Sequence, residues 1–282
     1  MSHAIKNVAL AGASGNVGAR VLDALLDLKF NVTVLSRNSK SFPTGACVKV
    51  VDFTSVEDLS AAIAGQDAVI DTTFSPEVDT PSDLLKQLLG LEFIACFITS
   101  DFGLDPDLPG VHDIPVFSRK KVSYEAVKKQ AADNRLTYTL VACGAFLDWG
   151  LSTGFAGLNF QEKTAWIFGD GSNVVPWTTL EDVGKATANV LLHPQETLNR
   201  PVYVHSVFMS QNQLFDAAKE ALGNKGGRPH IMTWNLFSKT LLPGYQSAGT
   251  PWARDDNALV GLEEWSQEKV KVLIRTVANK AM

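Results

Sequence analysis

Three residues at helical spacing have the side chains needed to transfer a proton. Lys120, Tyr124 and Lys128 follow one another at intervals of four residues, so on a helix they share one face. A lysine beside a tyrosine lowers the pKa of the phenol, which can then exchange a proton with a substrate oxygen near neutral pH. Pro115 predicts that this helix begins at about residue 116. Lys120 would then lie in about the first turn, with Tyr124 one turn deeper; a solvated, lysine-rich helix face is the alternative.

A glycine-rich segment earlier in the chain has the pattern of a phosphate-binding turn. It follows an apolar strand pattern at Asn7–Ala11 and precedes a helical pattern at 17–28. Glycine lets a backbone approach a ligand closely, and the first N–H groups of a helix have no intrahelical partner and can bind an anion. The spacing GxxGxxG in this context predicts a dinucleotide, held by Gly12, Ser14, Gly15, Asn16, Val17 and Gly18.

The end of the second expected strand, 31–37, predicts which dinucleotide binds. A carboxylate at this place would bind the ribose 2′-hydroxyl of NAD, whereas a basic residue accommodates the 2′-phosphate of NADP. The chain has Arg37 there and Lys40 soon after, with no acidic residue between them. The planar guanidinium suits phosphate, so we expect NADP(H), against the alternative of a solvated loop arginine. After the third strand, 48–52, Asp52 is placed to bind the adenine amino group, with Phe53 beside the ring; Asp52 could instead only cap the following turn.

Strands and helices alternate through the first half of the chain, with short connections. Further strands are expected at 68–73, 93–98 and 138–142, and a long helix at 117–134. Such alternation predicts an α/β fold, a doubly wound parallel sheet of Rossmann type. Ligands in such sheets gather beyond the carboxyl ends of the strands. We therefore expect the nicotinamide end of the cofactor near Thr72, Thr73, Phe74 and Ser100.

The regular alternation of strand and helix patterns ends at about residue 145. This change predicts an NADP-binding domain at 1–150 and a dependent substrate lobe at 151–282. Helix starts are expected at Ser55, Thr80–Asp83, Thr179 and Ser210. Aromatic residues are frequent in this half, and the irregular segment 224–258 is typical of a cap over a site. An apolar, aromatic substrate is expected, contacted by Asp101, Phe102, Phe146 and Trp149.

Composition excludes several other classes of protein. The net charge is −5 without a lysine-rich tract, which disfavours nucleic acid as a partner. Apolar runs are too short for a membrane span, and a strand expected from residue 7 leaves no room for a signal peptide. The three cysteines lack the spacing of a disulfide framework or zinc site, so no metal is expected. We expect a cytoplasmic protein with a small-molecule substrate; a homodimer is left open.

The motifs together resemble a known family. GASGNVG, the tail Thr99-Ser100-Asp101-Phe102-Gly103 and the segment Phe117-Ser118-Arg119-Lys120 are similar to those of NmrA-like and isoflavone reductase-like proteins, which are atypical short-chain dehydrogenases that include phenylcoumaran benzylic ether reductases. The segments 145–150 and 179–184 look like those of fungal members. The chain departs from the usual PSEFG at Thr99 and Asp101, which puts a simple transfer of substrate specificity in doubt.

The resemblance implies an activity. In the reductases of this family an FxxK lysine serves in proton transfer and cofactor binding, and Phe117 and Lys120 match that motif. We therefore expect an NADPH-dependent reductase of a small, largely apolar metabolite, aromatic or polycyclic, from secondary metabolism. Two alternatives fit the same fold: a redox-sensing regulator that binds NADP without turnover, as NmrA does, and an enzyme of redox-neutral rearrangement or cyclisation.

Overall fold

Seven parallel strands form the larger sheet, in the order β11-β6-β5-β4-β1-β2-β3. The computed structural model describes residues 4–74, 84, 94–113, 115–223, 229–231, 252 and 254–281. The order confirms the doubly wound sheet, and it reverses between β1 and β4, where such sheets bind ligands. The strands are β1 (Asn7–Ala11), β2 (Asn31–Ser36), β3 (Ala46–Val50), β4 (Ala68–Asp71), β5 (Ile94–Ile98), β6 (Leu136–Ala142) and β11 (Arg200–Tyr203).

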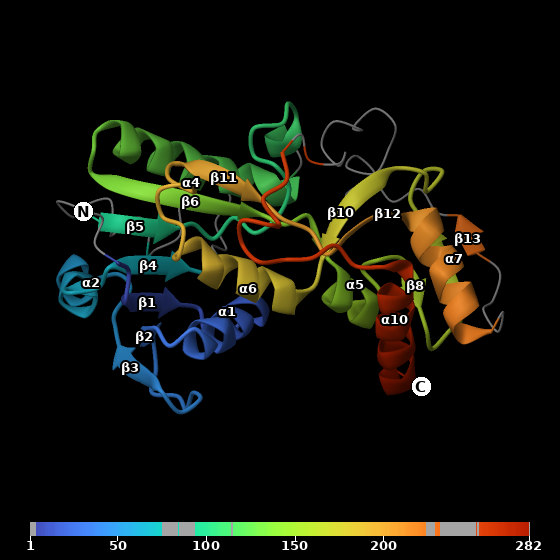
Figure 1. The fold of residues 1–282 in the computed structure, drawn as a ribbon, viewed down its shortest axis with the longest axis horizontal. Coiled ribbons are helices and arrows are strands. Elements are labelled where there is room, and N and C mark those ends of the chain that lie inside the picture. Colours follow the sequence, from blue (N-terminus) through green and yellow to red (C-terminus); the bar gives the residue numbers. More distant parts are fainter. Residues whose placement is uncertain are drawn as a thin grey trace.

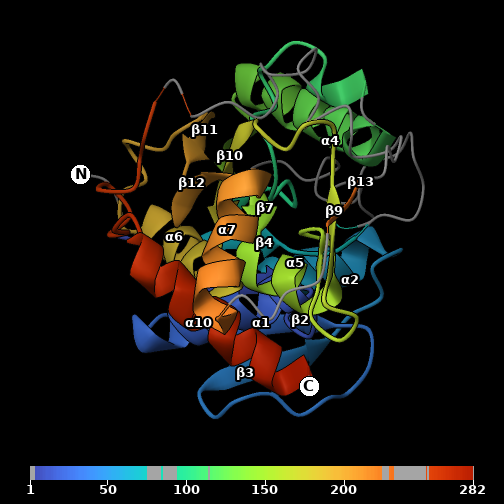
Figure 2. The ribbon, with the colours of Figure 1, turned by 90° about the vertical axis from the view of Figure 1, so that its right-hand side faces the viewer.

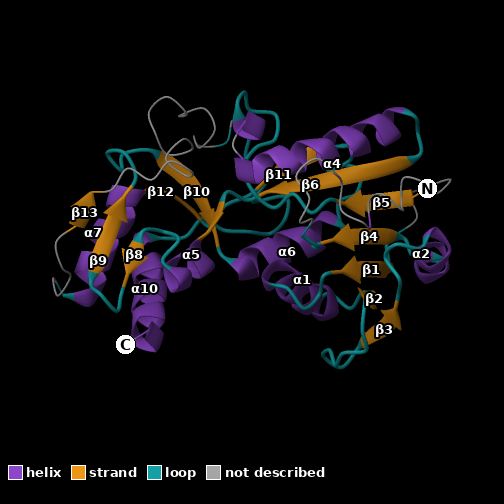
Figure 3. Cartoon of the chain, turned by 180° about the vertical axis from the view of Figure 1, so that it is seen from behind, coloured by secondary structure: helices purple, strands orange, loops and turns teal. Residues whose placement is uncertain are grey.

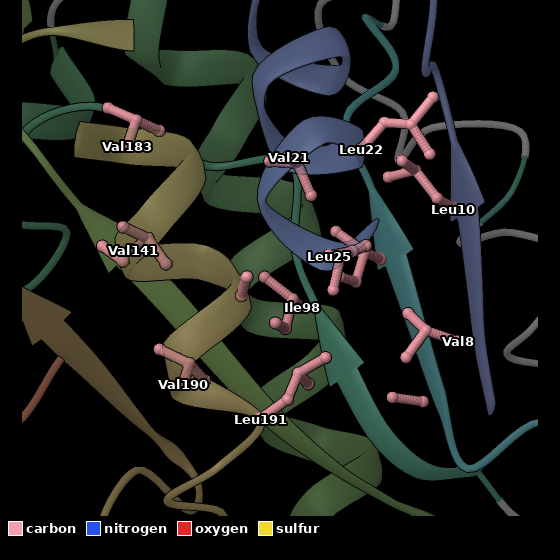
Figure 4. Close-up of a cluster of buried hydrophobic side chains, with 14 of the residues drawn as sticks. Val8, Leu10, Val21, Leu22, Leu25, Ile98, Val141, Val183, Val190 and Leu191 are labelled. Atoms are coloured by element: carbon pink, nitrogen blue, oxygen red, sulfur yellow. The ribbon is translucent and has the colours of Figure 1, made fainter. Parts of the chain in front are cut away.

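Helices cover both faces of this sheet, and the alternation of side chains along β1 shows how. Val8 and Leu10 belong to a core shared with α1 (Asn16–Asp27) and α6 (Leu180–Val190), as Figure 4 shows. Ala9 and Ala11 point to the other face, in a core shared with α2 (Val56–Ile63) and α4 (Pro115–Ala132). Successive side chains of a strand face opposite sides, so a strand buried on both faces reads as a continuous apolar run.

A smaller lobe extends from the carboxyl edge of the sheet (Figures 1 and 3). It contains the short sheets β12-β10-β7 and β13-β9-β8 and a third core, in which α7 and α10 pack side by side (Figure 2). Its elements are β7 (Ala145–Phe146), α5 (Leu147–Thr153), β8 (Leu158–Asn159), β9 (Thr164–Ile167), β10 (Val174–Thr178), β12 (Val207–Ser210), α7 (Gln211–Leu222), β13 (Pro229–Ile231) and α10 (Gln267–Ala281).

The second half of the chain also contributes to the larger sheet. β11 pairs with β6, and α6 packs against α1, so the elements around the larger sheet come from both sides of residue 150. The expected boundary at residue 150 therefore does not separate the residues of the larger sheet from those of the smaller lobe.

Local signals located most helix starts correctly. Ser55 and Thr179 cap α2 and α6 with their side chains, and Ser210 forms a complete capping box with Gln213. The third strand was expected at 48–52, but β3 spans Ala46–Val50. Its ends are set by pairing with β2, which a short apolar pattern in the sequence does not reveal. The expected helix start at Thr80–Asp83 and most of the segment 224–258 lie outside the described residues.

Candidate active site at the carboxyl edge of the sheet

The glycine-rich turn has the three glycine roles of a dinucleotide site. Gly12 adopts φ +83°, and a Cβ there would lie 2.5 Å from Thr72 Oγ1, so the tight turn against the tail of β4 requires glycine. Gly15 is the exposed N-cap of α1, where backbone can meet a pyrophosphate. Gly18 lets α1 pack on the turn, because a Cβ would collide with the Gly12 carbonyl. The residues therefore fit a dinucleotide, with exposed Ser14 and Asn16 and half-buried Val17 completing the rim.

Hydrogen bonds fix the segments that follow β4 and β5 beside this turn. Thr72 Oγ1 donates to the Ala11 carbonyl at 2.7 Å, and Ser100 Oγ donates to the Thr73 carbonyl at 2.6 Å. The ring of Phe74 is 74% exposed. The structure thus places all four residues expected at the nicotinamide end along one edge of the sheet, close to the point where strand order reverses.

Basic side chains lie at the end of β2, as a 2′-phosphate requires. Arg37 is exposed, and Lys40 Nζ donates to Ser14 Oγ at 3.3 Å, which brings this ammonium to the glycine-rich turn. Asp52 forms the turn cap that was the alternative for it: its Oδ1 accepts from the Thr54 hydroxyl at 2.7 Å and the Thr54 amide at 2.8 Å. These bonds lower the pKa of Asp52. Phe53 packs half-buried against the second core, and the adenine contacts of both residues stay predictions.

Lys120 lies where α4 approaches the tail of β5. Its Nζ donates to the Phe102 carbonyl at 3.1 Å and lies 4.0 Å from Asp101 Oδ1. A Cβ on Gly103 would lie 2.9 Å from the Phe117 ring and 3.3 Å from Lys120 Nζ. The glycine of the TSDFG tail therefore makes room for the phenylalanine and lysine of FxxK, so the two motifs form one unit.

Asp101 is buried beneath this lysine. Its residue is 4% exposed, and within the part of the chain that is described its Oδ2 has no hydrogen-bond partner. Burial raises the pKa of Asp101 to about 6, and the charge of Lys120 opposes that rise. Cys143, fully buried after β6, has its pKa raised to about 12 by burial.

Tyr124 is bound differently from what the YxxxK pattern predicts. Its hydroxyl donates to Asp107 Oδ1 at 2.9 Å, and its residue is only 3% exposed. The ammonium of Lys128 lies over the ring, 4.2 Å from its centroid. Burial, with lesser contributions from Tyr138 and Asp107, raises the pKa of Tyr124 instead of lowering it. That part of the expectation is wrong, because the phenol is held by a carboxylate and out of water.

The residues expected to contact the substrate are buried to different degrees. Phe102 is 8% exposed and belongs to the first core, against which half-buried Phe146 of β7 packs. Trp149, on α5, is half-buried with its ring 5.2 Å from that of Phe155. Their substrate roles stay predictions. Among the described residues no group of three metal-ligating side chains is found, and none of their helices is long and apolar enough to cross a membrane.

Three further side chains at this edge, Tyr203, Asp105 and Asp107, were not singled out from the sequence. Tyr203, at the end of β11, donates its hydroxyl to Asp105 Oδ1 at 3.0 Å. Asp105 and Asp107 thus anchor the loop between β5 and α4 to two tyrosines on separate elements. The partners are 98 and 17 residues apart, and no local pattern marks the pairs.

Comparison with known proteins agrees with this geometry. A profile of the NmrA-like family matches residues 4–248. Oxidoreductase poxI of Penicillium oxalicum is 32% identical over 228 residues, which cover 76% of this chain and 69% of that one. The phenylcoumaran benzylic ether reductase PT1 of Pinus taeda is 27% identical, over 70% and 68% of the two chains.

Solved structures share the fold. The leucoanthocyanidin reductase of Vitis vinifera, in its binary complex with NADPH, superposes with a TM-score of 0.71 at 18% identity, over 95% of this chain and 99% of that one. A nucleoside-diphosphate-sugar epimerase from Staphylococcus aureus gives 0.69 at 16% identity, over 95% and 99%. From the profile and the relatives together, the chain belongs to the NmrA-like family, in which it groups with oxidoreductases.

Proposed function

We propose that the protein is an NADPH-dependent reductase of a small, largely apolar metabolite that bears an aromatic or polycyclic group. The observation that carries the proposal is the ammonium of Lys120, held 3.1 Å from the Phe102 carbonyl at the same sheet edge as a glycine turn that fits a dinucleotide. The relatives that cover most of the chain are named oxidoreductases, and structural neighbours were solved with NADP(H).

The residues that would hold the cofactor lie along β1, β2 and β4. The amides at the start of α1 would bind the pyrophosphate, because helix N-termini bind anions. Arg37 and Lys40 offer charge-assisted hydrogen bonds to a 2′-phosphate. When bound, the nicotinamide supplies hydride.

Lys120 is the proton donor that the geometry favours over Tyr124. Its side chain is 22% exposed, so Nζ can meet a substrate oxygen and regain a proton from water. Tyr124 is buried, its hydroxyl is bound to Asp107 and its pKa is raised, so it gives up a proton less readily. A general acid at this place would protonate the oxygen that gains charge as the substrate is reduced.

The substrate class rests on the apolar surroundings of the edge. Phe74 presents an exposed ring beyond β4, and Phe146 and Trp149 follow β6. Apolar and aromatic walls with few polar groups are typical of sites for drug-sized apolar ligands. Two plant relatives are named phenylcoumaran benzylic ether reductase and pinoresinol-lariciresinol reductase, and these names agree with such a substrate class.

The test is NADPH oxidation, followed by absorbance, with a panel of enones, benzylic ethers and ketones. We expect turnover on at least one aromatic member, and little with NADH. Tight binding of NADPH without turnover on any member would instead favour the redox sensor. A converted substrate without net loss of NADPH would favour redox-neutral chemistry.

A further inference from the structure

A buried carboxylate lies behind the proposed proton donor, and one of its oxygens has no hydrogen-bond partner among the described residues. Asp101 Oδ1 is 4.0 Å from Lys120 Nζ, while Oδ2 has no partner in the described part of the chain. Buried polar atoms are nearly always hydrogen-bonded, so each exception in a native structure needs an explanation. An ionised carboxylate without a full set of partners is more costly still.

Among the described groups around Asp101, Lys120 is the one that carries the opposite charge. Within the described part of the chain, the titratable groups that face it are Lys120, from α4, and Cys143, which follows β6. Burial raises the pKa of the Cys143 thiol to about 12, so this neighbour is neutral and leaves the ammonium as the opposing charge. Burial also raises the pKa of Asp101 to about 6, so at neutral pH the carboxylate remains ionised at a cost to stability.

We infer that Asp101 is a positioning residue, whose carboxylate holds the Lys120 ammonium against the tail of β5 and keeps the proton on Nζ until a substrate oxygen takes it. The inference rests on the proposed function, and it gives Asp101 a role different from direct contact with substrate. Nζ is oriented by its hydrogen bond to the Phe102 carbonyl at 3.1 Å and by the negative charge of Asp101, whose Oδ1 lies 4.0 Å away.

The proton that the step transfers is accounted for without a further reactant. Nζ gives one proton to the substrate oxygen and becomes a neutral amine, whose lone pair then takes a proton from water. Above a pH of about 6 Asp101 stays a carboxylate during this step, because Nζ takes its replacement proton from solvent. It therefore acts through Lys120 and transfers no proton itself.

The first test measures Lys120 directly, without turnover. An amine acetylating reagent reacts with neutral lysine only, and mass spectrometry of the digested protein reports each lysine separately. We expect Asp101→Asn to raise the acetylation rate of Lys120 at pH 7 by roughly tenfold, because it removes the opposing charge 4.0 Å from Nζ. Lys121, the next residue on α4, pairs with Glu125 at 4.0 Å and is the internal control.

An equal change at Lys120 and Lys121 in that experiment would overturn the inference. Asp101→Ser offers the same comparison in a smaller side chain if the Asn variant does not fold, as judged by circular dichroism. Because acetylation needs no substrate, a tenfold rise at Lys120 supports the inference even when no member of the panel is reduced. In that case the proposed function fails alone.

The second test uses turnover on a substrate that the panel identifies. We expect Asp101→Asn to lower kcat at least tenfold with the KM for NADPH unchanged, and to remove the acidic limb near pH 6 from the profile of kcat/KM. Asp101→Glu, which restores the charge, is expected to regain part of kcat and the acidic limb. A structural role alone would lower stability and leave the pH profile in place, and that result would contradict the inference.

Discussion

The two ends of the sheet edge reach their chemistry by different means. At the β1–α1 end, cofactor binding is proposed to depend on backbone geometry and exposed charges. Three glycines, Gly12, Gly15 and Gly18, shape the turn, and the basic side chains of Arg37 and Lys40 are exposed near it. At the β5–α4 end the proposed acting groups are side chains, one of them a buried carboxylate beneath a lysine. The first end can bind a cofactor as soon as it folds, whereas the second depends on contacts between elements.

This difference explains why the two ends respond to different changes. A backbone site is insensitive to pH and to most side-chain substitutions, but it tolerates no added Cβ. A charge pair between elements tolerates small steric changes, but it depends on protonation and on the loop between β5 and α4. Asp105 and Asp107 tie that loop to Tyr203 and Tyr124, so these four side chains support the second end.

The largest effect is expected at the glycine-rich turn. Gly12→Ala combines a φ of +83° with a Cβ 2.5 Å from Thr72 Oγ1, and we expect the free energy of unfolding to fall by about 3 kcal/mol or more. Gly65→Ala is the matched control, because Gly65 has φ +77° and open space around it; a loss of about 1 to 2 kcal/mol is expected there. Urea unfolding measures both, and equal losses would show that the turn is not tightly packed on β4.

The next effect separates the two nicotinamide cofactors. Arg37→Ala is expected to weaken NADPH binding by roughly 10- to 100-fold, because charge-assisted hydrogen bonds contribute about 1.5–3 kcal/mol. Binding of NADH, which lacks the 2′-phosphate, should change little. Arg20→Ala removes an exposed arginine that pairs with Asp23 on the same helix, and it serves as the control. Equal weakening of both cofactors, by calorimetry, would remove Arg37 from the 2′-phosphate site.

The buried carboxylate predicts an unusual dependence of stability on pH. A carboxyl group whose folded pKa is raised, here to about 6 from 3.8, stabilises the fold at low pH, and that contribution is lost as pH rises through 6. Between pH 7.5 and 4.5 the wild type should therefore gain about 2 kcal/mol relative to Asp101→Asn, which does not titrate. Urea unfolding at both values provides the comparison, and a constant difference would mean that Asp101 titrates normally.

The smallest effect concerns the loop anchor. Tyr124→Phe removes the hydrogen bond to Asp107 but keeps the ring over which Lys128 lies. Since Asp107 is exposed and can turn to water, the expected loss is about 1 kcal/mol in the free energy of unfolding. Thermal unfolding of the variant at two pH values checks this, and a loss above about 3 kcal/mol would show that the anchor carries more than one hydrogen bond.

The sequence was sufficient for the first end of the site because its signals are local. Three glycines at fixed spacing between a strand and a helix predict the turn, and the capping box at Ser210 predicts the start of α7 from four consecutive residues. The parallel sheet follows from alternation of strands and helices. The place of β11 beside β6 depends on pairing across some sixty residues, which no local pattern marks.

The second end was predicted in part only. Lys120 was identified through FxxK, and Asp101 through its place after a strand, but their mutual distance depends on how the intervening loop folds. The spacing of Tyr124 and Lys128 predicted a helix face correctly, yet spacing cannot show that Asp107 would take the hydroxyl. No local sequence pattern predicts the contact between Tyr203 and Asp105, which are 98 residues apart.

The central claim is that the β5–α4 end supplies the proton from Lys120, and turnover of two variants of one helix tests it most directly. On the substrate that the panel identifies, Lys120→Met is expected to lower kcat by about 10²- to 10⁴-fold, as the loss of a general acid does. Tyr124→Phe should keep at least roughly a third of kcat, because that hydroxyl is committed to Asp107. Full turnover by Lys120→Met, or an equally deep loss in Tyr124→Phe, would contradict the account.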